Sequence, residues 1–305
     1  MNCRLLHIIS AFFIVLLCGL TVLGTLGGGA ASAAASFIYV RTDGDDAICN
    51  GQYDAAATAA PACAFASIGK GVQMVDSGGT IVVAAGVYTE SVSIDKDLTL
   101  QGDGADYTVV DGLGTIKGLH VNRGNAATVS AITIRNGHST YGGGIHNDGT
   151  LTLTNSAVTT NTASISGGGI FNGNDATMVI SNCVIGANTA VEDGGGVFNS
   201  YSELTVIGST VTSNSAGGHG GGMESVEGTL IIEGSALCEN SALGEYAVGG
   251  GLFSDSDAKL TKVTIAGNTS LDRSGGIHNQ GPMALTNFTI SGNAAATSGG
   301  GAIHS

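Results

Sequence analysis

The strongest constraint on the fold is a repeat of about 26 residues that occupies the second half of the chain. Each repeat holds a glycine cluster followed by an aliphatic residue, and later an aliphatic residue three positions before an asparagine. The aliphatic residues that follow the glycines are Ile145, Ile170, Val197, Met223, Leu252, Ile277 and Ile303. The asparagines are Asn161, Asn188, Asn214, Asn240, Asn268 and Asn293. A fixed period of this length predicts a solenoid of stacked coils.

Inside each repeat, apolar residues alternate with polar ones, as in Leu151-Thr152-Leu153-Thr154. A period of two indicates strands, and these runs are too short for propeller blades or sandwich strands. Three short strands per coil predict an all-β, single-stranded parallel β-helix, and the crossover preference of parallel strands makes it right-handed. We expect the helix over residues 79–305. Because the chain stops within a coil, a longer parent protein is also expected.

Glycine and asparagine have structural roles in this interpretation. The 51 glycines follow no three-residue period, which excludes collagen, and their clusters are expected to form tight corners. An asparagine amide at a turn can donate to the asparagine of one neighbouring coil and accept from that of the other. The six asparagines are therefore predicted to form a ladder that satisfies turn groups at every coil.

The first 36 residues resemble an export signal, with Arg4, an apolar stretch and the small residues Ala31-Ser32-Ala33. A retained transmembrane anchor is the alternative, because the apolar stretch is long enough to span a bilayer. The signal reading predicts a secreted protein, either extracellular or at the surface of an outer membrane.

Residues 37–78 differ from the coils and are predicted to cap the first of them. A short helix is expected over Ala66–Val75, where it would cover the open end of the solenoid. Cys49 and Cys63 lie close together in an exported segment, so a disulfide between them is predicted. Cys183 and Cys238 fall at different positions of the repeat, two coils apart, and both are expected to be buried thiols.

The charge balance excludes several partners. The chain has 24 acidic residues against 10 basic ones, and no lysine or arginine stands between Asn136 and Ala258. Such a surface repels nucleic acids, anionic membranes and acidic polysaccharides. We expect no nucleic-acid partner, and a glycan or another cell-surface ligand is the partner class that remains.

The regular coils show no catalytic signature. A lyase-like site needs a cluster of carboxylates and an arginine or lysine to take a proton, and solvated turns are the simpler interpretation of the residues present. The remaining candidates for such a site are Asp103, Asp106, Asp111, Arg123 and Arg135. No cofactor is predicted, except that a Ca²⁺ ion in an oxygen-rich turn is considered for Asp43, Asp45 and Asp46.

One position of the repeat collects aromatic rings. It follows the core aliphatic by one residue, so alternation directs its side chains outward, and it holds His146, Phe171, Phe198, Phe253 and His278. We predict a partly exposed ridge that serves as a contact surface; a strip covered by loops of the same chain is the alternative. His146 and His278 are five coils apart, too far to share a metal ion.

Two resemblances follow from these motifs. Gly300-Gly301-Ala302-Ile303 and its near copies, together with Val158-x-x-Asn161, resemble the Gly-Gly-Ala-Ile and Phe-x-x-Asn repeats of chlamydial-type polymorphic outer-membrane proteins. That resemblance implies surface or secreted adhesins, anchored through a region that this chain does not contain. Residues 78–83 and 86–90 resemble the pectin-lyase-like superfamily, which implies the fold alone.

The sequence therefore predicts an extracellular or cell-surface β-helix, adhesin-like or structural and without catalytic activity. The alternative is a polysaccharide lyase or glycoside hydrolase of pectin-lyase-like fold.

Overall fold

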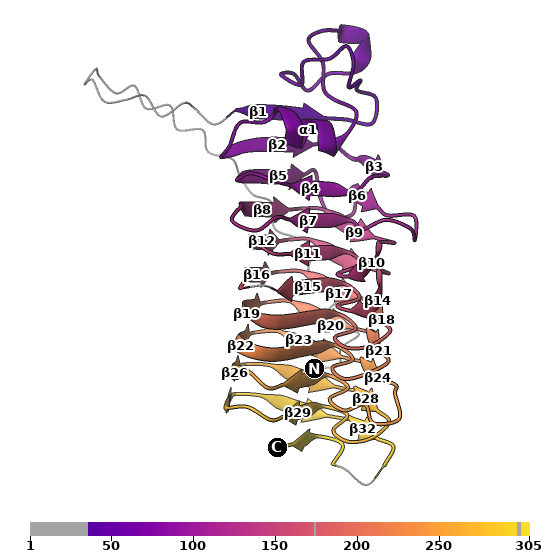
Figure 1. Cartoon of the computed structure of the whole chain (residues 1–305), viewed down its shortest axis with the longest axis vertical. Helices are drawn as coiled ribbons and strands as arrows, with labels where there is room; N and C mark the ends of the chain where they lie inside the picture. The colour runs from indigo at the N-terminus through magenta and orange to yellow at the C-terminus, as the bar shows by residue number, and fades with distance from the viewer. Residues whose placement is uncertain (1–35, 174, 298–299) are drawn as a thin grey trace, which may run out of the picture.

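A computed structural model describes residues 36–173, 175–297 and 300–305. The predicted signal peptide lies outside this range except for Ser36. The described chain forms three parallel sheets that wind around one core, so the predicted parallel β-helix is confirmed (Figure 1). No helix among the described residues is long and apolar enough to cross a membrane.

Sheet A has 17 strands and contributes two segments to a typical coil. Its strands are β1 (Phe37–Val40), β2 (Gly79–Val83), β4 (Val92–Ile94), β5 (Leu98–Gly102), β7 (Leu119–Val121), β8 (Ala126–Ser130), β11 (Ile145–Asn147), β12 (Thr150–Thr154), β15 (Ile170–Gly173), β16 (Thr177–Ser181), β19 (Val197–Ile207), β22 (Met223–Glu233), β25 (Leu252–Ser254), β26 (Asp257–Thr261), β29 (Ile277–Asn279), β30 (Met283–Thr286) and β33 (Ile303–His304).

Sheets B and C complete each coil. Sheet B has nine strands: β3 (Gly86–Tyr88), β6 (Thr108–Asp111), β9 (Thr133–Arg135), β13 (Ala157–Thr159), β17 (Val184–Gly186), β20 (Thr210–Thr212), β23 (Ala236–Cys238), β27 (Thr264–Ala266) and β31 (Thr289–Ser291). Sheet C has seven: β10 (His138–Tyr141), β14 (Thr162–Ser166), β18 (Thr189–Ala190), β21 (Ser215–Ala216), β24 (Ser241–Ala242), β28 (Thr269–Ser270) and β32 (Ala294–Ala295).

The aliphatic residues after the glycine clusters pair in register from coil to coil. Ile145 lies beside Ile170, and the same alignment continues through to Ile303. These side chains and the inward residues of the other strands form one continuous core of buried aliphatic groups. Each coil thus buries its apolar face against its neighbours, as a solenoid requires.

The glycine corners are places of close backbone approach. A Cβ atom on Gly196 would lie 2.5 Å from the carbonyl oxygen of Gly222 in the next coil and 2.8 Å from the Asn214 amide nitrogen. A side chain of any size at this position would therefore push adjacent coils apart.

The six repeat asparagines form a ladder at the turn between sheets B and C. At its centre, the side-chain amide and the backbone N–H of Asn188 both donate to Oδ1 of Asn214, each at 3.0 Å. The same Nδ2 also donates to the carbonyl of Val158 at 2.9 Å. The pattern extends from Asn161 to Asn293, and these side chains are buried over most of that length.

A second, shorter ladder was not anticipated. Asn147 donates to Asn172, and Asn172 to Asn199, each at 2.7 Å, and all three side chains are buried. The next coil has serine, and Ser225 Oγ accepts from Asn199 at 3.0 Å. These asparagines lie two residues after the core aliphatic, and their spacing equals that of the repeat, a signal that the sequence already contained.

The N-terminal segment covers the first coil. The expected short helix is α1 (Ile68–Met74), whose N-cap Ser67 accepts from the backbone N–H of Lys70 at 3.1 Å. It packs on β1, β2 and β4, and Figure 1 shows it at the N-terminal end of the stack. A 3₁₀ turn (Ala57–Ala59) lies in the irregular segment before it.

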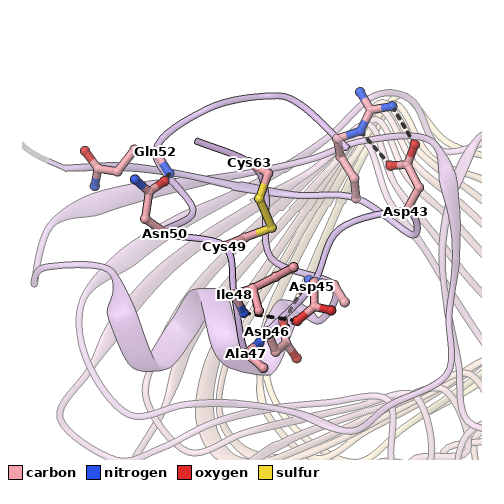
Figure 2. The surroundings of a disulfide bond; sticks show 11 residues. Asp43, Asp45, Asp46, Ala47, Ile48, Cys49, Asn50, Gln52 and Cys63 are labelled. Atoms are coloured by element: carbon pink, nitrogen blue, oxygen red, sulfur yellow. Dashed lines mark hydrogen bonds and ion pairs between the residues drawn. A yellow bond between two sulfur atoms is a disulfide. The ribbon is translucent and has the colours of Figure 1, made fainter. Parts of the chain in front are cut away.

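The cysteines follow the predictions with one exception. The disulfide between Cys49 and Cys63 is confirmed and ties the irregular segment together (Figure 2). Cys183 is a buried free thiol, whose pKa burial raises to about 11. Cys238 is buried as well, but it is disulfide-bonded, so the prediction of a thiol is wrong there.

Candidate functional site

One position on the outer face of sheet A differs in residue type from coil to coil. We call it the outer column. It is the residue after each core aliphatic, and backbone pairing aligns its members as Ser93, His120, His146, Phe171, Phe198, Glu224, Phe253, His278 and His304. All residues of the predicted aromatic ridge belong to it.

Most rings of the outer column stack on one another. The Phe171 and Phe198 rings are 5.7 Å apart with an interplanar angle of 11°, and Phe253 stacks on His278 at 5.6 Å and 9°. His278 stacks on His304 in turn, at 5.2 Å and 16°. Because stacked rings cover one another's faces, the stacked part offers few free faces for a planar ligand.

The predicted ridge is half-buried at His146, Phe171 and Phe198, in agreement with partial exposure, but its other two members are less exposed than predicted. Phe253 is 8% exposed and His278 7% exposed, so these two residues are buried. A physical reason is the preceding corner: His219 lies over the Phe253 ring at 5.1 Å, and its ring nitrogen Nδ1 accepts from the backbone N–H of Val248. At these coils, the alternative of a strip covered by the same chain describes the structure better.

Glu224 interrupts the rings between Phe198 and Phe253. It is buried, and its Oε2 has no hydrogen-bond partner among the described residues. Burial, and secondarily the negative charge of Asp193, raises the pKa of Glu224 well above its ordinary value. The side chain is thus stabilised in its neutral form.

The N-terminal end of the outer column holds a compact polar cluster. His120 Nε2 lies 2.9 Å from Asp148 Oδ2, and His146 Nε2 lies 3.3 Å from the other oxygen, Oδ1. Lys117 Nζ lies 3.2 Å from His146 Nδ1, on the far side of that ring. One carboxylate therefore bridges two imidazoles, with an amine directly behind one of them.

Neighbouring strands bring the cluster together. His120 is the middle residue of β7 and His146 the middle residue of β11, and the two are paired across adjacent coils. Asp148 follows β11, where its backbone N–H donates to the carbonyl of Val121 at 3.0 Å. The two histidines and Asp148 are thus positioned by backbone pairing rather than by free loops.

Burial and charge act on two members of the cluster. Burial lowers the pKa of His146, and the positive charge of Lys117 lowers it further. Burial also lowers the pKa of Lys117, although Asp148 opposes that shift. Perturbed groups gathered in this way mark a candidate functional site.

The ligand atoms of His120, His146 and Asp148 lie within 4.8 Å of one another, close enough to hold a metal ion. In the part of the chain that the structure describes, this is the sole group of three or more histidine, cysteine or acidic residues with that property. The cluster was not among the predicted sites, although His120 and His146 are spaced by one repeat period, which is a signal in the sequence.

The predicted catalytic candidates are not assembled. Arg135 Nε pairs with Asp111 Oδ2 at 2.8 Å, whereas Arg123 lies at another position of the coil and pairs with Asp175 at 3.4 Å. Asp103 and Asp106 are exposed residues next to β5 and β6. The five residues therefore form one ion pair and separate surface groups.

Asp111 is the buried member of that ion pair. Burial alone would raise the pKa of Asp111, but hydrogen bonds from the Leu113 backbone, Arg135 and Asn136 outweigh it and hold the pKa below its ordinary value. The pair is a neutralised structural contact of sheet B, where Asp111 and Arg135 are aligned on β6 and β9.

The three aspartates considered for Ca²⁺ face separate protein donors. Asp43 pairs with Arg41 at 2.8 Å, and Asp45 accepts from the backbone N–H of Ala47 at 2.7 Å. Asp46 accepts from Ser67 Oγ at 2.6 Å. Figure 2 shows Asp43 apart from Asp45 and Asp46, and among the described residues the three carboxylates do not form a group of converging ligand atoms.

The fold is similar to that of pectin-modifying enzymes. The chain superposes on a pectin methylesterase from carrot with a TM-score of 0.51 and 10% identity, covering 91% of this chain and 90% of that one. The values for pectate lyase Pel9A are 0.53 and 14%, with 85% and 79% covered. For the pectin methylesterase PemA from Erwinia chrysanthemi they are 0.50 and 9%, with 86% and 91% covered.

No protein-family model matches the sequence, and no curated protein matches it either. The likeness to polymorphic outer-membrane protein repeats therefore stays a resemblance of motifs. At identities of 9–14%, this structural likeness shows the fold and carries no activity across. The chain has the right-handed parallel β-helix fold of pectin-lyase-like proteins.

Proposed function

We propose that the chain is an extracellular or cell-surface β-helix that acts as an adhesin-like or structural scaffold without catalytic activity. The observation that supports this proposal is that the predicted catalytic acids and bases are paired or separate and do not form one cluster. Asp111 and Arg135 neutralise each other, Arg123 and Asp175 form a separate pair, and Asp103 is an exposed residue after β5. A catalytic site needs such groups convergent on one reacting centre.

The charge distribution indicates which ligands suit this scaffold. The coils between Asn136 and Ala258 carry acidic side chains and no lysine or arginine. Like charges repel a polyanion along that entire surface, so neutral or cationic glycans and cell-surface proteins are the favoured ligands. The same repulsion disfavours acidic polysaccharides such as pectate as the natural partner.

One observation favours the alternative, a polysaccharide lyase or glycoside hydrolase. Lys117 is half-buried beside His146 and Asp148, and its pKa is lowered, as a general base requires. In that reading Lys117 replaces Arg123 and Arg135 as the proton acceptor, and Asp148 is the neighbouring carboxylate.

A paired assay of binding and turnover separates the two functions. The purified protein is incubated with neutral, cationic and acidic glycans, with and without Ca²⁺, while product release and retention on each glycan are measured. Saturable retention without product supports the scaffold. Turnover that Lys117→Met abolishes and Lys259→Met leaves intact would contradict it and establish the enzyme, since Lys259 is an exposed lysine on β26.

A further inference from the structure

We propose that His120, His146 and Asp148 form a binding site for a transition-metal dication of the Zn²⁺ class. The proposal goes beyond the scaffold function and does not depend on it. It rests on the geometry of the cluster, on the orientation of its two imidazole rings and on the chemistry of its donor atoms.

The donor atoms already surround a common point. Nε2 of His120 and Nε2 of His146 contact the two oxygens of the same carboxylate, at 2.9 and 3.3 Å. All three ligand atoms lie within 4.8 Å of one another. Bonds from Zn²⁺ to its ligand atoms are about 2.0–2.2 Å long. Small movements of the three side chains, within their present rotamers, would therefore place these atoms around one ion.

The rings at this site break the pattern of the outer column. Elsewhere in the column, Phe171 and Phe198, Phe253 and His278, and His278 and His304 stack at interplanar angles of 9–16°. His120 and His146 instead meet edge to face at 62°, with centroids 5.0 Å apart. This rotation aims both Nε2 atoms at Asp148.

The remaining nitrogen of His146 has a suitable hydrogen-bond partner. Nδ1 of His146 lies 3.3 Å from the carbonyl oxygen of Tyr141. Histidines that bind a metal through one ring nitrogen commonly donate the other N–H to a carbonyl or carboxylate, which fixes the tautomer. The Tyr141 carbonyl provides that acceptor when Nε2 binds the ion. The Lys117 ammonium, 3.2 Å from the same Nδ1, competes with this arrangement, because it can only donate and so favours the tautomer with the proton on Nε2.

The donor set selects the class of ion. Two imidazoles and one carboxylate suit Zn²⁺, Co²⁺, Ni²⁺ and Cu²⁺, whereas Ca²⁺ and Mg²⁺ prefer more oxygen ligands. The side chains of His120, His146 and Asp148 are 31%, 15% and 19% exposed, so solvent reaches the cluster. Three protein ligands leave a fourth tetrahedral position, which water or a ligand carboxylate can fill.

Lys117 opposes a cation at this site. Its Nζ lies behind His146, next to Nδ1 rather than next to the convergent Nε2 atoms. The amine therefore leaves the metal position free, but its charge repels a bound dication. We expect Lys117→Met to tighten binding about tenfold, from the Coulomb energy of charges a few ångströms apart in a partly solvated site.

Calorimetric titration of the metal-stripped protein with ZnCl₂ tests the proposal. We expect one Zn²⁺ per chain at the site. His120→Gln, His146→Gln and Asp148→Asn should each lower the Zn²⁺ affinity at least about 100-fold, because removing a ligand costs more than removing a residue that only hydrogen-bonds to a ligand. His278→Gln is the matched control, because it alters another histidine of the outer column and should leave binding unchanged. Circular dichroism checks that each variant is folded.

Visible spectra with Co²⁺ in place of Zn²⁺ report the coordination independently. A four-coordinate site with two imidazoles should give intense visible bands that disappear in His146→Gln and persist in His278→Gln. Absence of Zn²⁺ binding to the wild-type protein would overturn the proposal. Binding that survives in all three ligand variants, or that His278→Gln removes, would overturn it as well. The glycan assay of the scaffold function is unaffected by either outcome.

Discussion

The asparagine ladder and the outer column both repeat once per coil, yet one keeps a single residue type and the other varies. Six asparagines occupy the ladder, whereas serine, histidine, phenylalanine and glutamate share the outer column. In the ladder, each side chain supplies hydrogen bonds that the backbone of neighbouring coils requires. In the outer column, backbone pairing is complete without the side chain, so residue type is free to change.

The difference indicates which positions of a β-helix are required for its stability and which can carry a binding site or a reactive group. A buried polar network is stable only when every member is satisfied, which restricts the ladder to asparagine. An outward position on a paired strand has no such requirement. A metal-binding cluster, a stacked ring and a buried acid can therefore occur at equivalent positions of successive coils.

The largest effect is expected in the ladder. Asn188→Ala removes the acceptor of both the Asn161 backbone N–H and the Asn161 amide, and the donor to the Val158 carbonyl. Three buried groups lose partners, so the free energy of unfolding should fall by about 3–5 kcal/mol. Urea denaturation measures it, with the adjacent exposed Thr189→Ala as the control. Equal losses of stability in the two variants would contradict the stabilising role of the asparagine ladder.

The outer column offers a change of the opposite sign. Glu224→Gln removes a buried acid whose pKa is raised, so it should stabilise the protein by about 1–2 kcal/mol at pH 7–8. Because the raised pKa favours the neutral acid in the folded state, wild-type stability declines as pH rises above about 4.3, the ordinary value for glutamate.

The gain from Glu224→Gln should therefore shrink toward zero in acid. Thermal unfolding of both proteins at pH 4 and pH 8 measures the difference. Glu233→Gln, on an exposed position of the same strand β22, is the control and should show little change at either pH. A gain of equal size at both pH values would mean that burial of the charge is not its cause.

The smallest effect is expected on the outer face of sheet B, where Asp111 pairs with Arg135. Asp111→Asn should lower the free energy of unfolding by about 1 kcal/mol at pH 7. The pKa of Asp111 is lowered, so its stabilising effect is present above the ordinary aspartate pKa and is lost as pH falls through the folded value. Urea midpoints of the two proteins should converge in acid; a constant gap would contradict this assignment.

Sequence patterns could predict the parts of the molecule that repeat or that act locally. The period identified the coil, the core aliphatics and the turn asparagines, and the cysteine spacing identified the Cys49–Cys63 disulfide. Each of these depends on residues that are near in sequence or spaced by a whole coil. The same kind of spacing relates His120 and His146.

The rest depends on how far each corner folds over its neighbours. Asp148 reaches His120 only because the turn after β11 returns beside β7, in a region where the repeat is less regular. Burial of Glu224 and Phe253 depends on the preceding corners, whose lengths differ between coils. Alternation indicates that such residues point outward, but it does not indicate whether a loop covers them.

Anomalous X-ray diffraction at the zinc edge, from crystals grown with one equivalent of Zn²⁺, tests most directly the claim that the outer column carries chemistry. The account predicts one strong peak between His120 Nε2, His146 Nε2 and the Asp148 carboxylate, with the asparagine ladder unchanged. A peak at another residue set, or no ordered zinc in the protein, would contradict it.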